Sequence, residues 1–439
     1  MNLQHILALY CGCNMRGENF KVAGSYLEIT GSYFEIAGSN IGSVMKKEFY
    51  LDVAATTPVN PIVRDEIFRV MDNIYGNPSS LHQKGIESHA VVEKARKTIA
   101  DYINCKPSEI IFTSGACEAN SLAICGWRKK NSGYIITSNI EHKSIVSIPN
   151  IDYTIHVDEK GFFNFEELDT LINDVTEFRK DFLSQFSSDI GIDYNFTFIL
   201  STQAANSEIG TIQDIQRIAD IVHKYNGIFH CDATQLFPYQ RIDVKKLGID
   251  MLSMSGQKIN TPKGIGFLYV KEGIELEPLI YGSQENNLRG GTSNVSYIAG
   301  LAKAIELLDK KIRPIEKPHV QYVRDYMEGK MLHSIGDCII NGNKNYRLPN
   351  NINISFKGIE SESLLLMLNQ HNIYVSAGSA CNSGDSSPSY VLQAIKVPDE
   401  YIRGTIRITL PDDFTFEEAD YVVGVIKDCV ERLRKFGEK

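Results

Sequence analysis

The chain has 439 residues, 43% of them hydrophobic and 23% charged, with a net charge of −9. This composition is normal for a folded globular protein, and the length favours two or three domains. The acidic balance argues against direct nucleic-acid binding, which needs clustered basic residues. Small molecules and other proteins are therefore the expected partners.

The nine cysteines are odd in number and irregularly spaced, and no pair of CxxC motifs predicts a zinc or other metal site. We interpret them as reduced thiols in a cytoplasmic protein. No apolar run reaches the ~18 residues that span a bilayer, so no membrane association is expected. The first residues also lack the basic stretch of a secretory signal.

Residues 1–47 differ from the rest of the chain. They contain a seven-residue echo, GSYLEIT, GSYFEIA and then GSNIGS, whose alternation of apolar and polar residues is strand-like. The segment could be a β-arm or an extension of little value. It could also result from a translation start assigned too early, with Met45 as the alternative first residue. We predict an N-terminal extension that the chemistry does not need.

Strand and helix patterns alternate from about residue 92 onward. Amphipathic helices are expected at 116–130 and 212–224, and residues 166–195 are typical of a polar helical insertion. This alternation predicts an α/β domain at 65–294, with a mostly parallel seven-stranded sheet between helices. The expected strands are Glu109–Thr113, Tyr134–Thr137, Thr154–His156, Phe196–Leu200, Ile228–Cys231, Met251–Met254 and Ile265–Val270.

The order of elements changes at about residue 295. Long helices at 295–315 and 317–335 precede strands at Ile352–Ser355 and Thr405–Thr409, and a helix at 415–435 closes the chain. We expect residues 48–64 and 295–439 to form a smaller α+β domain.

Asp232 and Lys258 follow two neighbouring strands of the predicted sheet. Parallel strands end at the same edge, where ligands bind. A carboxylate can keep a pyridine nitrogen protonated while a lysine forms a Schiff base, which is the pair that pyridoxal 5′-phosphate (PLP) needs. Alone, Lys258 is typical of a solvated loop and Asp232 of a helix cap; together, in matching contexts, they indicate a cofactor site.

The segment FTSGACEANSLAI predicts a strand, a small-residue turn and a helix. The free N–H groups of such a helix start, from Ala116 and Cys117, suit a phosphate. Ser255 can add a hydroxyl. The same residues also fit an ordinary capped helix with Ser114 as its N-cap.

At this point the sequence resembles a known family. The motifs YLDVAATTP, YGNPSSLH, FTSGACEAN, EHKSI, SEIGTIQDI, HCDATQ, SGQKINTPKGIG, LRGGT, SAGSACNSG and GTIRITL are similar to those of the cysteine desulfurases. These are fold-type I PLP enzymes of aminotransferase class V. The resemblance covers residues 48–436, and the long loop around Cys381 is similar to the branch that serves iron–sulfur assembly and tRNA thiolation.

The resemblance implies roles for individual residues. Lys258 is similar to the Schiff-base lysine, Asp232 to the partner of the pyridine nitrogen, and His142 to the catalytic histidine that stacks on the ring. Without that context His142 would be interpreted as a capping or core histidine. The full set implied to bind the cofactor is Ala116, Cys117, His142, Ser207, Asp232, Gln235, Ser255, Gln257, Lys258 and Thr292.

The resemblance also implies a substrate, an acceptor and an assembly. Arg407 would clamp the carboxylate of L-cysteine, with Asn206 beside it, because a planar guanidinium suits a bidentate contact. Thr292 would reach the phosphate of a neighbouring subunit in a homodimer. Cys381 lies in a Ser-, Gly- and Asn-rich segment typical of an exposed loop, where its thiolate could receive the substrate sulfur and pass it to an acceptor protein.

Three positions next to the expected cofactor depart from the family pattern. Cys117 replaces a usual Thr, Ser207 a usual Asn and Gln257 a usual His. A thiol is a poor hydrogen-bond donor, and each weakened bond costs about 0.5–1.5 kcal/mol. We therefore predict weaker PLP retention or a specialised rate or substrate.

Other functions stay open from the sequence alone. A selenocysteine or cystine lyase, or a plain class V aminotransferase, would use the same cofactor without needing Cys381. The three departures also motivate a PLP-binding scaffold or regulator with little turnover, which docks sulfur-acceptor proteins.

Overall fold

The computed structural model describes residues 47–131, 133–186, 197–312, 318–377 and 388–437, together with four short strands before residue 36. The chain divides into two units, Met1–Glu48 and Phe49–Lys439. In the first unit β1 (Lys21–Val22) pairs with β2 (Ser25–Tyr26), and β3 (Glu28–Thr30) with β4 (Tyr33–Glu35), both antiparallel. Because β3 and β4 belong to successive copies of the seven-residue echo, its alternation does correspond to strands there.

The second unit contains a seven-stranded sheet in the order β6-β12-β11-β10-β9-β7-β8. The five strands from β11 to β8 are parallel to one another, while β12 pairs antiparallel with both β11 and the edge strand β6. The sequence prediction of a mostly parallel, seven-stranded sheet is therefore confirmed. The bounds are β6 (Ile110–Thr113), β7 (Tyr134–Ser138), β8 (Tyr153–Ile155), β9 (Phe198–Gln203), β10 (Ile228–Asp232), β11 (Met251–Ser255) and β12 (Gly266–Val270).

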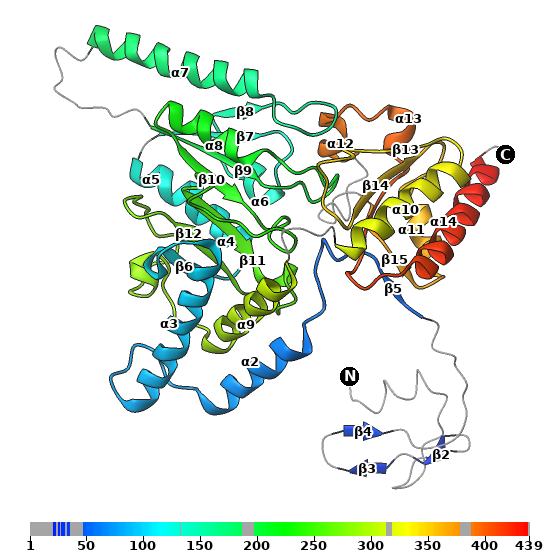
Figure 1. Ribbon diagram of the computed structural model, residues 1–439, viewed down its shortest axis with the longest axis horizontal. Coiled ribbons are helices and arrows are strands. Elements are labelled where there is room, and N and C mark those ends of the chain that lie inside the picture. The colour runs from blue at the N-terminus through cyan, green and yellow to red at the C-terminus, as the bar shows by residue number, and fades with distance from the viewer. Residues whose placement is uncertain are drawn as a thin grey trace. The chain divides into compact units, whose positions relative to one another are not determined.

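Helices cover both faces of this sheet (Figure 1). Successive strand residues point to opposite faces, and in β9 Ile199 belongs to one apolar core while Phe198 and Leu200 belong to the other. One core includes buried residues of α3 (Gln83–Ile103) and α8 (Ile215–Lys224); the other includes Trp127, which follows α4 (Ala116–Ser121) and a π-turn at Leu122–Gly126. The α8 helix begins at an Asp214 cap and buries one stripe of its surface.

A separate apolar core lies behind a three-stranded antiparallel sheet of β13 (Cys338–Ile340), β14 (Asn351–Phe356) and β16 (Thr405–Thr409). The helices that contribute to it are α10 (His319–Ser334), α11 (Ser361–Asn369) and α14 (Phe416–Gly437). Short elements complete this part: β5 (Phe49–Tyr50) paired with β15 (Ile373–Tyr374), α12 (Tyr390–Ala394) and α13 (Asp399–Ile402).

Helix α9 (Val295–Lys311) packs on α2 (Pro61–Asn73) and α3, and its buried side chains belong to the core of the large sheet. Residues 295–311 thus pack against the large sheet, whereas the domain boundaries predicted from the sequence assign them to the smaller domain. The predicted insertion at 166–195 corresponds to α7 (Phe165–Phe186), and residues 187–196 lie outside the described part. No helix in the described residues has both the length and the apolar character to cross a bilayer.

Candidate active site

A cavity of about 200 Å³ lies where the parallel strands β10 and β11 end. Its wall combines residues from the β6–α4 turn, the start of α6 (Lys143–Val146) and the turn after β11. Nine of the residues predicted from the sequence line it: Ala116, Cys117, His142, Ser207, Asp232, Gln235, Ser255, Gln257 and Lys258.

Lys258 ends the short 3-10 turn Gly256–Lys258 that directly follows β11. Its Nζ donates to the carbonyl oxygens of Ala54 and Ala55, at 2.6 and 2.5 Å. Gln235 Nε2 also donates to the Ala54 oxygen, at 3.1 Å. The amine is therefore held at the cavity wall by the VAATTP segment, which the sequence did not place beside it.

Asp232 is the last residue of β10 and is buried. Its Oδ1 accepts from the backbone N–H of Thr234 at 3.0 Å, and its Oδ2 accepts from Asn120 Nδ2 at 2.8 Å. The hydroxyl of Thr234 is buried at the cavity wall and has no hydrogen-bond partner in the described residues. A buried polar atom of this kind calls for a ligand partner.

His142 is the N-cap of α6, which confirms the capping interpretation, and it also lies in the cavity wall, where the functional interpretation expects it. Its Nδ1 accepts from the backbone N–H of Ser144 at 3.1 Å. Burial lowers the pKa of the imidazole, while nearby Asp232 raises it and Lys258 lowers it further. His142 is therefore neutral at neutral pH.

The turn before α4 differs from the capped helix that the sequence also allowed. Gly115, not Ser114, is the N-cap residue, and it makes no side-chain capping bond. Its φ of 150° and ψ of −177° lie in a region essentially restricted to glycine. An added Cβ there would lie 3.3 Å from Ser255 Oγ. The turn thus leaves the N–H groups of the first helical residues available to an anion.

The two residues expected to bind the substrate, Arg407 and Asn206, lie beyond the cavity wall. Arg407, in β16, donates to the Ser207 carbonyl at 3.0 Å and forms an ion pair with Asp52 at 2.7 Å. Its Nε is buried without a partner in the described residues. Asn206 is also buried: its Nδ2 donates to the Ile140 oxygen at 2.9 Å, and its Oδ1 accepts two backbone N–H groups of the following turn.

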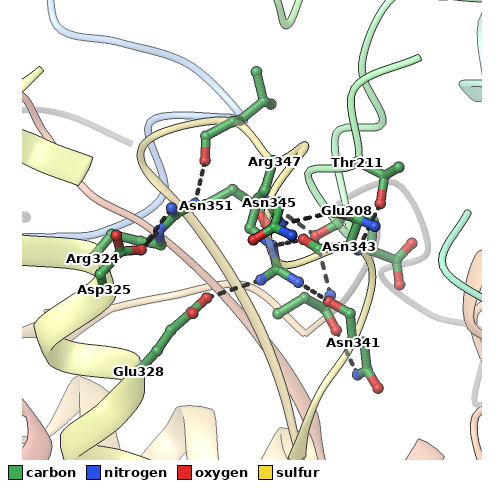
Figure 2. A network of polar contacts seen from close by, with 12 residues as sticks. Glu208, Thr211, Arg324, Asp325, Glu328, Asn341, Asn343, Asn345, Arg347 and Asn351 are labelled. Carbon is green, nitrogen blue, oxygen red and sulfur yellow. Dashed lines mark hydrogen bonds and ion pairs between the residues drawn. The ribbon is translucent and has the colours of Figure 1, made fainter. Parts of the chain in front are cut away.

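The turn that carries Ser207 is attached to the β13–β14 region by a polar network (Figure 2). Asn351 and Asn353 both donate to the carbonyl oxygen of Glu208, at 3.2 and 3.1 Å. Nearby, the buried guanidinium of Arg347 pairs with Glu328 at 3.0 Å. The turn that carries Ser207 follows β9 of the large sheet and is therefore held in part by side chains of β14 in the smaller sheet.

Besides Arg407 and Asn206, two further predicted residues, Thr292 and Cys381, do not line this cavity. Thr292 is exposed and lines a separate cavity of about 140 Å³, which shares Ser114 and Gly264 with the first. Cys381 lies outside the described residues. The described segment resumes just after its loop, where Ser389 donates to Glu208 Oε2 at 2.8 Å.

The residues present fit PLP. An amine and a carboxylate share one cavity wall, a glycine turn begins a helix at that wall, and the unpartnered Thr234 hydroxyl adds a donor. These are the groups that an aldehyde, a ring nitrogen and a phosphate require.

A family model described as Aminotransferase class-V matches residues 49–422, so the chain is a class V aminotransferase-family protein, a PLP-dependent class. The "Cysteine desulfurase IscS" of Dictyoglomus turgidum is 40% identical over 405 residues, which are 89% of this chain and 96% of that protein. A solved "NifS-like protein" has a TM-score of 0.77 at 32% identity, over 88% of this chain and 100% of that one. The structure of "SspA in complex with cysteine" has a TM-score of 0.68 at 32% identity, over 83% and 99%. Within its class, the chain belongs to the cysteine desulfurase family.

Proposed function

We propose that this chain takes the sulfur atom from L-cysteine, leaving L-alanine and a persulfide on Cys381 for transfer to an acceptor protein in iron–sulfur cluster assembly or thiolation. The observation that carries the proposal is the single cavity lined by Lys258, Asp232 and His142. Family membership and the cysteine-bound SspA structure support L-cysteine as the substrate.

Each residue has a task in this proposal. Bound PLP would supply an electron sink for the substrate's α-carbon. Lys258 would hold its aldehyde, Asp232 would keep the ring nitrogen protonated, and the turn at Ala116 and Cys117 would receive the phosphate. His142 would face the ring. Gln235, Ser255 and Gln257, which line the same cavity, would complete the contacts.

Arg407 supports recognition of an amino-acid carboxylate. Its guanidinium is already held by Asp52 and the Ser207 carbonyl, and the buried Nε remains as a donor. Asn206 stabilises the adjacent turn by accepting two of its N–H groups. A rigid, planar donor set of this kind suits a carboxylate better than a lysine would.

The sulfur transfer balances without an external oxidant. The Cys381 thiolate would attack the substrate sulfur, the carbon–sulfur bond would break, and the bonding electrons would stay on the substrate's β-carbon, which takes up a proton. One sulfur atom moves, so cysteine becomes alanine and the Cys381 thiol becomes a persulfide.

We also propose a homodimer in the cytoplasm. Large apolar side chains are exposed around α2 and the start of α3, and Leu81 is 95% exposed. Such a patch favours a protein interface. The exposed Thr292 would then reach the phosphate of the neighbouring site. The patch comprises Ile62, Phe68, Met71, Tyr75, Leu81 and Ile86.

The cytoplasmic location is supported by the cysteines. The six described cysteines form no disulfide, which is consistent with a reducing compartment.

The activity is tested by loading the purified chain with PLP and measuring alanine formed from L-cysteine. Lys258→Ala should abolish alanine formation, and Cys381→Ser should abolish persulfide formation. Cys105→Ser is the matched control, because burial raises the pKa of its thiol to about 12 and leaves it un-ionised at neutral pH. Full turnover in Cys381→Ser would favour a lyase or an aminotransferase. No turnover in the unmutated protein would favour the scaffold.

The dimer is tested by light scattering in solution. Leu81→Asp should shift the mass towards the monomer, whereas Leu366→Asp, on the exposed side of α11, should not. A monomeric unmutated protein would refute the dimer and leave the role of Thr292 without support.

A further inference from the structure

Behind the cavity wall, a chain of hydrogen bonds joins His142 to Asp232. Ser144 Oγ lies 2.8 Å from His142 Nδ1, and Asn120 Nδ2 donates to Ser144 Oγ at 2.9 Å. The same Nδ2 donates to Asp232 Oδ2 at 2.8 Å. Neither Asn120 nor Ser144 lines the cavity.

The hydrogens of this chain can be counted. The Asn120 amide has two, and both are used, one on Asp232 and one on Ser144. The reverse amide orientation would set Oδ1 against the Asp232 carboxylate, so the donors must point this way. Ser144 Oγ accepts from Asn120 and keeps one hydrogen to donate; because the backbone N–H of Ser144 already donates to His142 Nδ1, that nitrogen is an acceptor and the hydroxyl hydrogen is directed to it.

His142 Nδ1 therefore faces two donors from the same residue, the hydroxyl and the backbone N–H of Ser144. A ring nitrogen that accepts two hydrogen bonds carries a lone pair. The proton of the neutral imidazole must then reside on Nε2.

Resting on the proposed desulfurase function, we propose that Asn120 and Ser144 are positioning residues that hold His142 as its Nε2–H tautomer and fix Asp232 at the same time. Asn120 is fully buried, and its Oδ1 has no partner in the described residues. An unsatisfied buried acceptor is unfavourable. Its presence here follows from directing one amide hydrogen to Asp232 and the other to Ser144.

The first test is imidazole ¹⁵N NMR, with the His142 signal assigned by His142→Gln. In the unmutated protein Nδ1 should show the shift of an unprotonated, hydrogen-bonded nitrogen. Ser144→Ala should move the signal towards a mixture of tautomers and lower kcat roughly three- to tenfold at unchanged KM, the loss expected for one such bond. Ser144→Thr should restore both, and Ser147→Ala, on the exposed face beside the same helix, should change neither.

A proton found on Nδ1 of the unmutated protein would overturn the proposal, as would an unchanged signal and kcat in Ser144→Ala. If Ser144→Ala does not fold, Asn120→Leu tests the same positioning role in its place. It also removes the unsatisfied Oδ1, which offsets part of the stability lost with the two donated bonds; the His142 signal should shift, and apo-protein should bind PLP more weakly because Asp232 loses a donor. An Asn120→Leu protein with native signal and PLP affinity would refute the role.

The two proposals fail in different ways. Without alanine formation, the desulfurase function is wrong, but the NMR measurement on the apo-protein still decides the tautomer. With normal alanine formation and a proton on Nδ1, the function stands and the positioning role is wrong.

Discussion

Replacing Glu141 by glutamine should remove a pH dependence of stability. Glu141 directly precedes His142 and is fully buried. Its carboxyl accepts from Thr202 Oγ1 at 2.9 Å and from the Gln203 N–H at 2.6 Å, and it also contacts Ser138 Oγ. Burial nevertheless raises its pKa to about 8, because desolvation outweighs these donors.

The direction of this pH dependence follows from proton binding to Glu141. Between the ordinary glutamate pKa of 4.5 and about 8, the folded chain carries a proton on Glu141 that the unfolded chain has lost. The stabilisation is complete below the unfolded pKa and is lost as the pH rises through the folded one. The free energy of unfolding should therefore fall by about 1.4 kcal/mol per pH unit on account of this group.

The measurement is a double difference of thermal midpoints. Wild type and Glu141→Gln are each melted at about pH 6 and about pH 8, so that the contributions of other titrating groups cancel. Their unfolding free energies should diverge by about 2 kcal/mol between the two conditions, roughly 2 °C for a chain of this size. The exposed Glu166→Gln serves as control. Parallel pH profiles for wild type and Glu141→Gln would show that Glu141 does not titrate in this range, and the reasoning would be wrong.

Three further predictions concern the site and its support. Cys117→Thr should tighten PLP binding roughly two- to tenfold, because a hydroxyl is the better hydrogen-bonding group; fluorescence titration of the apo-protein measures it, and unchanged affinity would contradict it. Arg407→Lys should raise KM for cysteine at least about tenfold while PLP stays bound; equal kinetics in steady-state assays would count against the clamp. Glu328→Ala should cost roughly 3 kcal/mol of unfolding free energy because it leaves Arg347 buried and unpaired; a loss below about 1 kcal/mol in thermal melts would refute this.

Local patterns predicted the large sheet and its ligand-binding edge. Asp232 and Lys258 each follow an apolar run, and such runs identify buried strands without knowledge of their neighbours. The bounds of β9 were harder to predict. It extends to Gln203, and its last three residues are polar but buried. Ser201 bonds His230 and Thr202 bonds Glu141, contacts that neither polarity nor periodicity reveals.

The partners of the site residues could not be predicted from local sequence. Asp52 and Arg407 are 355 residues apart in the chain, and Asn120 and Asp232 are 112 apart. Asn120 occupies an ordinary buried position of a helical pattern, where apolar neighbours suggest only core packing. Periodicity identifies the face that a residue occupies, but not which distant strand end that face meets.

The geometry separates the residues proposed to bind the cofactor from the arginine proposed to bind the substrate. Asp232, His142 and the backbone of Lys258 belong to the large sheet and its adjoining turns, whereas Arg407 belongs to β16 of the smaller sheet. The two meet at the Ser207 carbonyl, which accepts from Arg407, and at Glu208, which accepts from Asn351 and Asn353. Loosening β14 should therefore displace Arg407, the proposed carboxylate clamp, while Asp232 stays in place, because Thr234 and Asn120 hold it. Variants of the β14 asparagines should accordingly lose affinity for cysteine before they lose the cofactor.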